Sequence, residues 1–410
     1  MRAPLVVSAA GVSRFLLHAQ GLAEAATPPS DASTTATLRK IRQLGCVQLD
    51  PVAVVERNQH LVLAARLPGY EPDSLEMLRR RRRVFEYWAN AACILPIESF
   101  PAFEGTRRRF RKRLAFELAE LRPIVRRMMA ALESGGPLPA RGFASPERLR
   151  GYWDGAEART KATSHALTLL FRTGALVVAR REGAERYFDL AERVIPEGLL
   201  RNAADMTTRD ADEAMLEMYL RAYRVFDARD ARFGWRAMTA RARAAAVRER
   251  LSAAAIVPLS IPGVSRQYFV SASDVRALRH HERAAADAAA DDGPMARFLP
   301  PLDNLLWRRD RVLDVFGFRY LWEGYLPAAR RRYGHYAMPI LVGSRLVGRI
   351  DPRLDRSRRR LVVRLLHLES GVPVTRRLRE SLAAGLEAFA RFHGAVGFEV
   401  ERTEPPRLRV

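Results

Sequence analysis

A helical segment followed by a β-hairpin occurs twice in succession in this chain, and this repeat limits the folds open to it. In each copy the first strand carries Leu or Ile followed by Val, and the second carries Arg followed by Tyr-Phe. Leu176 to Tyr187 spans 11 positions and Ile256 to Tyr268 spans 12, so the copies are nearly in register. Helices followed by a hairpin are typical of a winged helix, in which the hairpin is the wing. The predicted elements are helices at 164–173, 207–226 and 238–251, the first preceded by a helix starting at Ser145-Pro146, and strands at 175–181, 186–190, 255–259 and 266–270.

The first part of the chain predicts a further winged helix. Ser8 is a plausible N-cap for a helix that ends near Gly21, and Thr34 or Thr35 caps a second helix that stops at Gly45. A short strand at 46–50 follows and ends at a proline.

The last part of the chain has a different pattern. Strands are predicted at 339–344, 346–351, 361–366 and 398–401, with a helix at 376–392. We therefore expect an α+β chain of three tandem winged-helix domains and a small C-terminal antiparallel β-barrel or sheet domain. The predicted boundaries are 1–134 for winged helix 1 with its basic helix, 140–204 for winged helix 2, 205–292 for winged helix 3 and 293–410 for the C-terminal domain.

The strand at 46–50 reads Cys-Val-Gln-Leu-Asp. Strand alternation places Val47 and Leu49 on a packed side and Gln48 and Asp50 on an open side. Their Cβ atoms would lie roughly 6–7 Å apart, so one water could touch both side chains. Alternating polar residues also occur on any half-buried strand, so spacing alone leaves an ordinary surface strand open.

Charge narrows the choice of partner. The 69 Lys and Arg residues against 46 Asp and Glu give a net charge of +23. Only three of the basic residues are lysines, and Arg suits phosphate and base contacts. A GC-rich genome would explain Arg in place of Lys, but it would not explain the net charge. We therefore expect a nucleic acid partner.

Several other classes are disfavoured. Two cysteines provide no disulfide framework, the histidines show no ligand spacing, and a Gly-rich phosphate loop is missing, so we expect neither a metal nor a cofactor. No apolar run reaches the roughly 18 residues of a membrane span. The expectation is a monomer without membrane contact in the cytoplasm, associated with the nucleoid.

Basic and aromatic residues alternate after the first strand. Five arginines at 79–83 precede Phe85-Glu86-Tyr87-Trp88-Ala89-Asn90. Phe85 and Trp88 could stack on bases or belong to the core. Further basic residues at 107–113 open a predicted long helix that continues past Met128.

These motifs resemble the winged-helix DNA glycosylases of the AlkZ and YcaQ (AlkX) type. The resemblance covers almost the whole chain. It rests on Leu44 to Asp50, Val54-Val55-x-Arg57, Phe85 to Ala89, Pro301-Leu302-Asp303, Phe316-Gly317-Phe318-x-Tyr320, Glu323-Gly324-Tyr325, Arg332-Tyr333-Gly334-x-Tyr336 and Pro339-Ile340-Leu341.

The resemblance implies excision of N7-alkylguanine, unhooking of DNA interstrand crosslinks, and a catalytic motif of Gln, an apolar residue, then Gln or Asp. Gln48-Leu49-Asp50 is similar to the Asp-bearing version. Asn90-Ala91 departs from the His-Glu that often follows Phe-Glu-Tyr-Trp-Ala, so lesion preference or rate is open to change. The candidate catalytic residues are Gln48 and Asp50, and the candidate DNA-binding residues are Arg57, Trp88, Asn90, Arg180 and Arg181.

The chemistry suits these residues. Asp50 would activate water and stabilise an oxocarbenium-like sugar, and Gln48 would position the water or the deoxyribose. A lyase would need a nucleophilic amine, and the nearest lysine in sequence, Lys40, lies on the preceding helix, so a monofunctional hydrolase is expected. An open groove that leaves the lesion in the duplex fits a crosslink better than base flipping. A non-catalytic winged-helix regulator or lesion binder and an RNA-binding protein are the alternatives.

Overall fold

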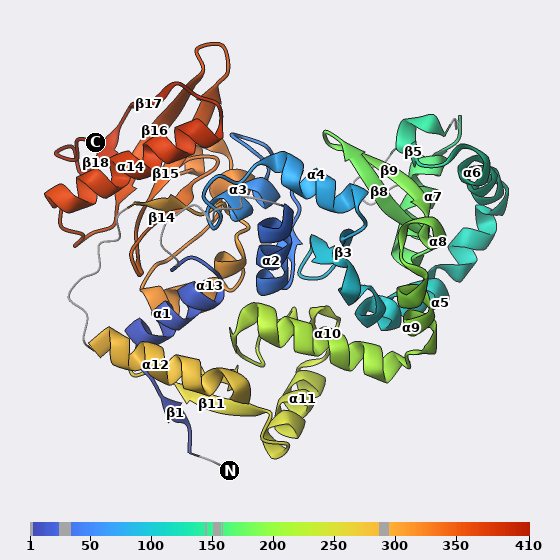
Figure 1. Ribbon diagram of the computed structural model, residues 1–410, viewed down its shortest axis with the longest axis horizontal. Helices are drawn as coiled ribbons and strands as arrows, with labels where there is room; N and C mark the ends of the chain where they lie inside the picture. Colours follow the sequence, from blue (N-terminus) through green and yellow to red (C-terminus); the bar gives the residue numbers. More distant parts are fainter. Residues whose placement is uncertain (1–2, 24–33, 144–145, 151–156, 158, 287–294) are drawn as a thin grey trace. The chain divides into compact units, whose positions relative to one another are not determined.

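The computed structural model describes residues 3–23, 34–143, 146–150, 157, 159–286 and 295–410 (Figure 1). The fold is α+β. Contacts gather the chain into two compact units, each built from segments that are separate in sequence. Unit 1 comprises Met1–Glu71, Tyr219–Phe233 and Ala237–Val410, and unit 2 comprises Pro72–Met218 and Gly234–Arg236. The arrangement as four consecutive domains therefore stays a prediction.

One sheet of unit 1 contains the second predicted hairpin. The strands β11 (Ile256–Ser260) and β12 (Tyr268–Ser271) pair antiparallel, which confirms this hairpin. The N-terminal strand β1 (Leu5–Val6) pairs parallel with β11, and β10 (Val225–Phe226) pairs with β12. The sequence did not predict β1, because two residues are too short to show alternation. Residues from the first and third predicted winged helices thus share one sheet.

Two helices connect the same parts of the chain. Ser8 caps α1 (Ala9–Ala19) as predicted, because its hydroxyl accepts a hydrogen bond from the Gly11 amide. The Ser8 hydroxyl also donates to Glu282 of α12 (Val275–Ala286) at 2.6 Å. The alanine- and Asp-rich sequence at 276–291 predicts a helix here, and the last part of that range, from 287 on, lies outside the described residues.

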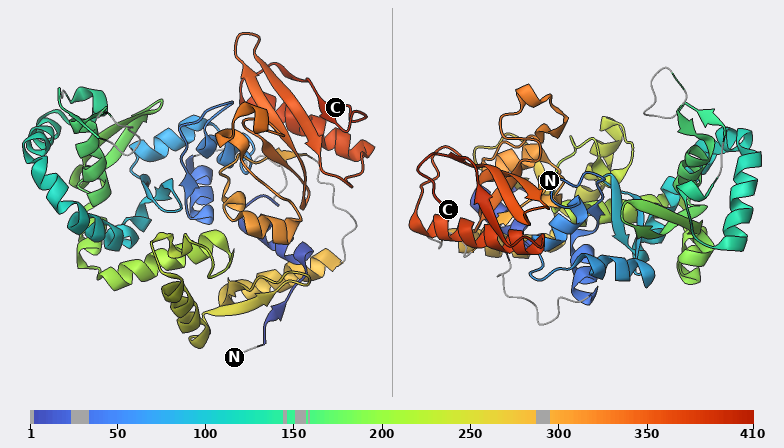
Figure 2. Two further views of the ribbon diagram at one scale, coloured as in Figure 1. Left: turned by 180° about the vertical axis from the view of Figure 1, so that it is seen from behind. Right: turned by 90° about the horizontal axis from the view of Figure 1, so that it is seen from above.

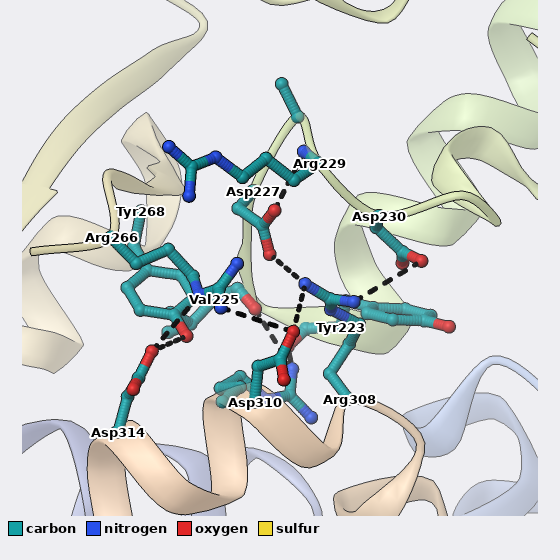
Figure 3. A network of polar contacts seen from close by, with 12 residues as sticks. Tyr223, Val225, Asp227, Arg229, Asp230, Arg266, Tyr268, Arg308, Asp310 and Asp314 are labelled. Atoms are coloured by element: carbon teal, nitrogen blue, oxygen red, sulfur yellow. Dashed lines mark hydrogen bonds and ion pairs between the residues drawn. The ribbon is translucent and has the colours of Figure 1, made fainter. Parts of the chain in front are cut away.

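A network of polar side chains holds α13 (Arg309–Phe316) against the sheet of β1, β11, β12 and β10 (Figure 3). Arg311 is buried and donates to the carbonyl oxygens of Tyr223 and Val225. On the next turn, Asp314 accepts a hydrogen bond from the Tyr268 hydroxyl at 2.7 Å. One face of α13 is therefore tied both to β12 and to the segment that leads into β10.

The C-terminal sheet follows the order β13-β14-β15-β16-β17, and β18 also pairs with β16. The helix α14 lies across one face of it and contributes Leu378, Leu382 and Leu386 to the core (Figures 1 and 2). The described strands form an open path, and both β17 and β18 run parallel to β16. The expectation of an antiparallel sheet is wrong for these two pairs, because α14 crosses back between β16 and β17. The elements are β13 (Arg297–Phe298), β14 (Met338–Val342), β15 (Arg345–Asp355), β16 (Arg360–Leu368), α14 (Arg376–Phe392), β17 (Gly397–Val400) and β18 (Thr403–Glu404).

Unit 2 contains the first predicted hairpin, formed by β8 (Leu176–Glu182) and β9 (Glu185–Leu190), which is confirmed. The predicted long basic helix is wrong in one respect. It breaks at Leu121, because Pro123 occupies the first turn of the following helix and favours a new helix start there. The unit also contains α4 (Pro72–Arg80), β3 (Val84–Trp88), β4 (Ala92–Pro96), α5 (Glu104–Glu120), α6 (Arg122–Gly135), β5 (Leu138–Pro139), α7 (Ala162–Thr173), α8 (Ala191–Val194), α9 (Glu197–Asp205) and most of α10 (Thr208–Tyr223).

The prediction of a helix that starts at Ser145-Pro146 is also wrong. Ser145 lies outside the described residues, and β6 (Arg148–Leu149) pairs with β7 (Thr160–Lys161) where the helix was expected. Among the helices of the described residues, none is long and apolar enough to cross a membrane.

Candidate active site

The candidate catalytic strand lies in unit 1, directly after α2 (Thr34–Leu44). Gly45 ends the helix with a φ of 77°, a left-handed conformation that glycine adopts without strain. The strand β2 (Val47–Gln48) is shorter than the five residues predicted. Asp50 therefore lies beyond the strand, on the connection to α3 (Asn58–Ala64).

Two buried asparagines hold the backbone of this strand. The side-chain amide of Asn304 donates to the Cys46 carbonyl at 2.8 Å. The amide of Asn58 donates to the Gln48 carbonyl, also at 2.8 Å. Asn304 and Asn58 are 1% and 0% exposed, so water does not compete for these hydrogen bonds. The position of the motif is thus fixed from outside the strand.

The two motif side chains differ in burial. Gln48 is buried, whereas Asp50 is half-buried. The expectation that both side chains share an open side is therefore wrong for Gln48. Val47 and Gln48 point to opposite sides of β2 and both are buried, so packing from other segments covers both faces of this short strand.

The Asp50 carboxylate accepts one hydrogen bond, from the Val52 amide to Oδ1 at 2.7 Å. Among the described residues, it makes no salt bridge with an arginine or lysine. Burial raises the pKa of Asp50, and the hydrogen bond from Val52 opposes part of this increase. The result is a carboxylate with increased basicity and one oxygen not engaged by the described residues.

A buried tyrosine lies near this carboxylate. Burial raises the pKa of the Tyr336 hydroxyl, and the negative charges of Asp50 and Glu56 raise it further. The Tyr336 amide donates to Asp351 at 3.1 Å, which holds the backbone at this point. Tyr336 and Glu56 were not predicted as site residues. Tyr336 ends the Tyr333-Gly334-x-Tyr336 motif, which was the available signal.

Arg57 lies close in sequence to the motif and in the same unit. It occupies the N-cap position of α3, its side chain is half-buried, and its amide donates to the Glu56 carboxylate at 2.7 Å. The structure thus brings Gln48, Asp50 and Arg57 into one unit.

The other candidate residues lie in unit 2, on two hairpins. Trp88 ends β3 and packs edge-on against Phe171, with ring centroids 6.4 Å apart. Asn90 is buried in the turn that joins β3 to β4. Phe85, the other aromatic of this strand, is 2% exposed and belongs to the core.

The two wing arginines have different surroundings. Arg181 forms two hydrogen bonds with the buried Glu86 carboxylate, at 2.6 and 2.8 Å. A DNA phosphate would have to compete with this carboxylate. Arg180 lies over the Tyr187 ring at 3.6 Å, pairs with Glu182 and is exposed enough to reach a partner. Arg180 is therefore the stronger candidate for a DNA contact.

The described residues contain no group of three or more His, Cys, Asp or Glu side chains that could hold a metal ion.

The family model described as DNA glycosylase AlkZ-like matches residues 41–392. The chain belongs to this family. The matched region contains Gln48, Asp50 and all the other candidate residues of the AlkZ-like site. The resemblance inferred from the motifs is thereby confirmed, and with it a place among the DNA glycosylases, which are DNA repair enzymes.

A solved structure with a similar fold is the Streptomyces sahachiroi DNA glycosylase AlkZ. The TM-score is 0.62 at 17% sequence identity, with 97% of this chain and 100% of that chain covered. At this identity the similarity shows a shared fold with this AlkZ-like chain.

Proposed function

We propose that this chain is a DNA glycosylase that hydrolyses the N-glycosidic bond of N7-alkylguanine and unhooks DNA interstrand crosslinks. Alkylation at N7 places a positive charge on the guanine, which makes the base a good leaving group. Little acid catalysis is then needed. The enzyme must instead stabilise the oxocarbenium-like sugar and direct a water at it.

The surroundings of Asp50 carry the proposal. Its carboxylate is half-buried, with one oxygen bound to Val52, and a raised pKa makes it a better base toward water. Its negative charge would also stabilise the sugar cation, more strongly in a partly buried site than in bulk water. We assign Asp50 both roles.

Gln48 has the positioning role in this proposal. Its amide can donate to and accept from a water or the deoxyribose. The hydrogen bond from Asn58 to the Gln48 carbonyl fixes the backbone that carries the amide. Precise placement of a reacting group gives a rate advantage that a mobile residue would lose.

We further propose a monofunctional hydrolase. Imine chemistry requires a nucleophilic amine. The Lys40 ammonium is buried on α2 and donates to the Gln43 side chain at 2.8 Å. These surroundings favour a structural role for Lys40 and not nucleophilic attack of its amine on a sugar.

The test is release of the base from defined DNA substrates. Wild-type protein is incubated with a duplex containing N7-methylguanine and with one containing a nitrogen-mustard crosslink. We expect base release and unhooking by the wild type and a loss of at least 100-fold in Asp50→Asn, with a smaller loss in Gln48→Ala. Asp73→Asn is the matched control, because Asp73 is an exposed carboxylate in the other unit.

Two results would contradict the proposal. The first is wild-type activity in both Asp50→Asn and Gln48→Ala. The second is the absence of base release by the wild type with sequence-specific binding of DNA, which would identify a non-catalytic winged-helix protein. A separate experiment addresses Asn90. Rates of base release from several N7 adducts, compared between wild type and Asn90→His, show whether this position sets lesion preference.

A further inference from the structure

An exposed aromatic side chain stands out in unit 1. Tyr325 is 83% exposed, although it ends the short 3₁₀ helix Glu323–Tyr325, whose first residue is buried. Its ring packs edge-on against the buried Trp322, with centroids 4.9 Å apart. One side of the ring is thus supported by protein, while most of its surface faces solvent.

The segment that carries Tyr325 is held rigidly at its base. The buried Glu323 carboxylate accepts hydrogen bonds from the amides of Tyr333 and Gly334, at 2.7 and 3.2 Å. The Trp322 indole donates to the His335 carbonyl at 3.1 Å. We call residues 319–336 the aromatic–arginine loop. Its two ends are joined, so Tyr325 is exposed on a fixed support.

Gly324 allows this close packing. A Cβ atom at this position would lie 2.6 Å from Nε1 of Trp322 and 3.1 Å from the His335 carbonyl oxygen. A larger residue would push the indole away. The order Glu323-Gly324-Tyr325 therefore combines an internal anchor, a close approach and an exposed ring.

The loop that carries the ring also carries exposed positive charge. Arg319, Arg330 and Arg332 are exposed, and none of them forms an ion pair with a carboxylate in the part of the chain that the structure describes. Arg331 donates to the Leu326 carbonyl at 2.8 Å, which folds the arginine run back beside Tyr325. The acidic residue of the loop, Glu323, is buried and cannot neutralise the surface.

The loop is connected to the candidate active site within one core. Trp322 packs against Tyr336 as well as Tyr325, with ring centroids 6.2 Å apart in the first pair. The pKa of the Tyr336 hydroxyl is raised by burial and by the charge of Asp50. Val55, five positions after Asp50, belongs to the same buried cluster. Tyr325 is thus two aromatic contacts away from Tyr336.

We propose that the aromatic–arginine loop is a binding surface for duplex DNA, in which Arg330 and Arg332 contact phosphates and Tyr325 stacks on a base at an opened step. Guanidinium groups suit phosphate, and an exposed ring on a rigid support suits the face of a base. This inference rests on the proposed function, because the DNA bound by the loop would be the same molecule whose damaged nucleotide reaches Asp50.

The experiment measures binding and base unstacking separately from catalysis. Affinity for an undamaged fluorescent duplex is measured by anisotropy at several salt concentrations, and unstacking by the fluorescence of 2-aminopurine placed in the duplex. The variants are Tyr325→Ala, Tyr325→Phe and the double variant Arg330→Ala/Arg332→Ala. Val396→Ala is the matched control, because Val396 is also exposed, at 69%, but lies outside the loop.

We expect Tyr325→Ala to bind about tenfold more weakly and to lose the 2-aminopurine signal, and Tyr325→Phe to keep both. The double variant should lower the slope of log affinity against log salt by about 2, one unit for each lost phosphate contact. Thermal melting should not change in Tyr325→Ala, because the side chain is exposed.

The inference fails if Tyr325→Ala and the double arginine variant bind within twofold of wild type, or if Tyr325→Phe loses as much as Tyr325→Ala. Neither result depends on base release. Wild-type protein that releases no base but needs Tyr325 for DNA binding would refute the proposed catalysis and support this surface. Normal base release by the wild type, together with unimpaired DNA binding by all variants, would support the proposed catalysis and refute this surface.

Discussion

Arg66 and Asp303 form a two-pronged ion pair in the interior of unit 1. The guanidinium nitrogens lie 2.7 and 2.8 Å from the two carboxylate oxygens, and both side chains are 0% exposed. Asp303 also accepts a hydrogen bond from the Leu305 amide. Asn304, which lies between Asp303 and Leu305 in sequence, donates a hydrogen bond to the Cys46 carbonyl. This ion pair therefore fixes the turn that positions the candidate catalytic motif.

Asp303→Asn is expected to destabilise the protein by about 3–5 kcal/mol, because it leaves the Arg66 charge buried without its partner. Chemical denaturation measures the loss. The control is Glu380→Gln, which removes an exposed pair with Arg376 and should leave the midpoint unchanged. Equal effects of the two substitutions would contradict the prediction.

Asn304→Ala should lower the rate of base release while leaving affinity for undamaged DNA as in wild type. The substitution removes the hydrogen bond from Asn304 to the buried Cys46 carbonyl and loosens the strand, at a cost of about 1–3 kcal/mol in stability. Single-turnover kinetics should show a loss of about tenfold or more. A parallel loss of DNA affinity would indicate a broader disruption of unit 1.

The pH dependence of base release should show the raised pKa of Asp50. In the proposed mechanism activity needs the ionised carboxylate, so the rate should fall on the acid side with a midpoint above the ordinary Asp value of about 3.9. The measurement is kcat/KM for N7-methylguanine release between pH 4 and pH 8. A midpoint at or below the ordinary value would argue against Asp50 as the base.

Asp50→Asn should be at least as stable as wild type at neutral pH. A carboxylate with a raised folded-state pKa stabilises the fold when protonated, and this contribution is lost as the pH rises through that pKa. The neutral amide removes the cost of the buried charge. Thermal melting at pH 7 compares the two proteins, and a clear loss of stability in Asp50→Asn would contradict this expectation.

Glu86 should have the opposite pH effect. Burial raises the pKa of Glu86, but the hydrogen bond from Arg181 and the charges of Arg79, Arg181 and Arg186 outweigh burial and lower the pKa. A lowered pKa contributes stability above the unfolded-state value, and the contribution disappears as the pH falls through the folded-state value. Glu86→Gln should thus cost about 3 kcal/mol at pH 7 and much less in acid. Denaturation at pH 7 and in acid provides the comparison.

Local patterns predicted the elements where the signal is local. Ser8 caps its helix, the two hairpins have the expected strands, and the helix Arg376–Phe392 has the predicted bounds. Each depends on a cap, a turn or a periodicity within a few residues. Pro123 is also a local signal for the break at Leu121, but the continuous basic residues before it favoured the prediction of a single long helix.

The sequence alone determined the family, the positive charge and the choice of a candidate catalytic motif, because these depend on which residues occur and at what spacing. Only the tertiary structure decided the environment of the motif. Asn58, which follows Asp50 by eight positions, and Asn304, far along the chain, both hold its backbone. The burial that raises the pKa of Asp50 comes from packing between distant segments, and no local pattern encodes which segments meet. The same reason explains why Gln48, expected on an open side, is buried.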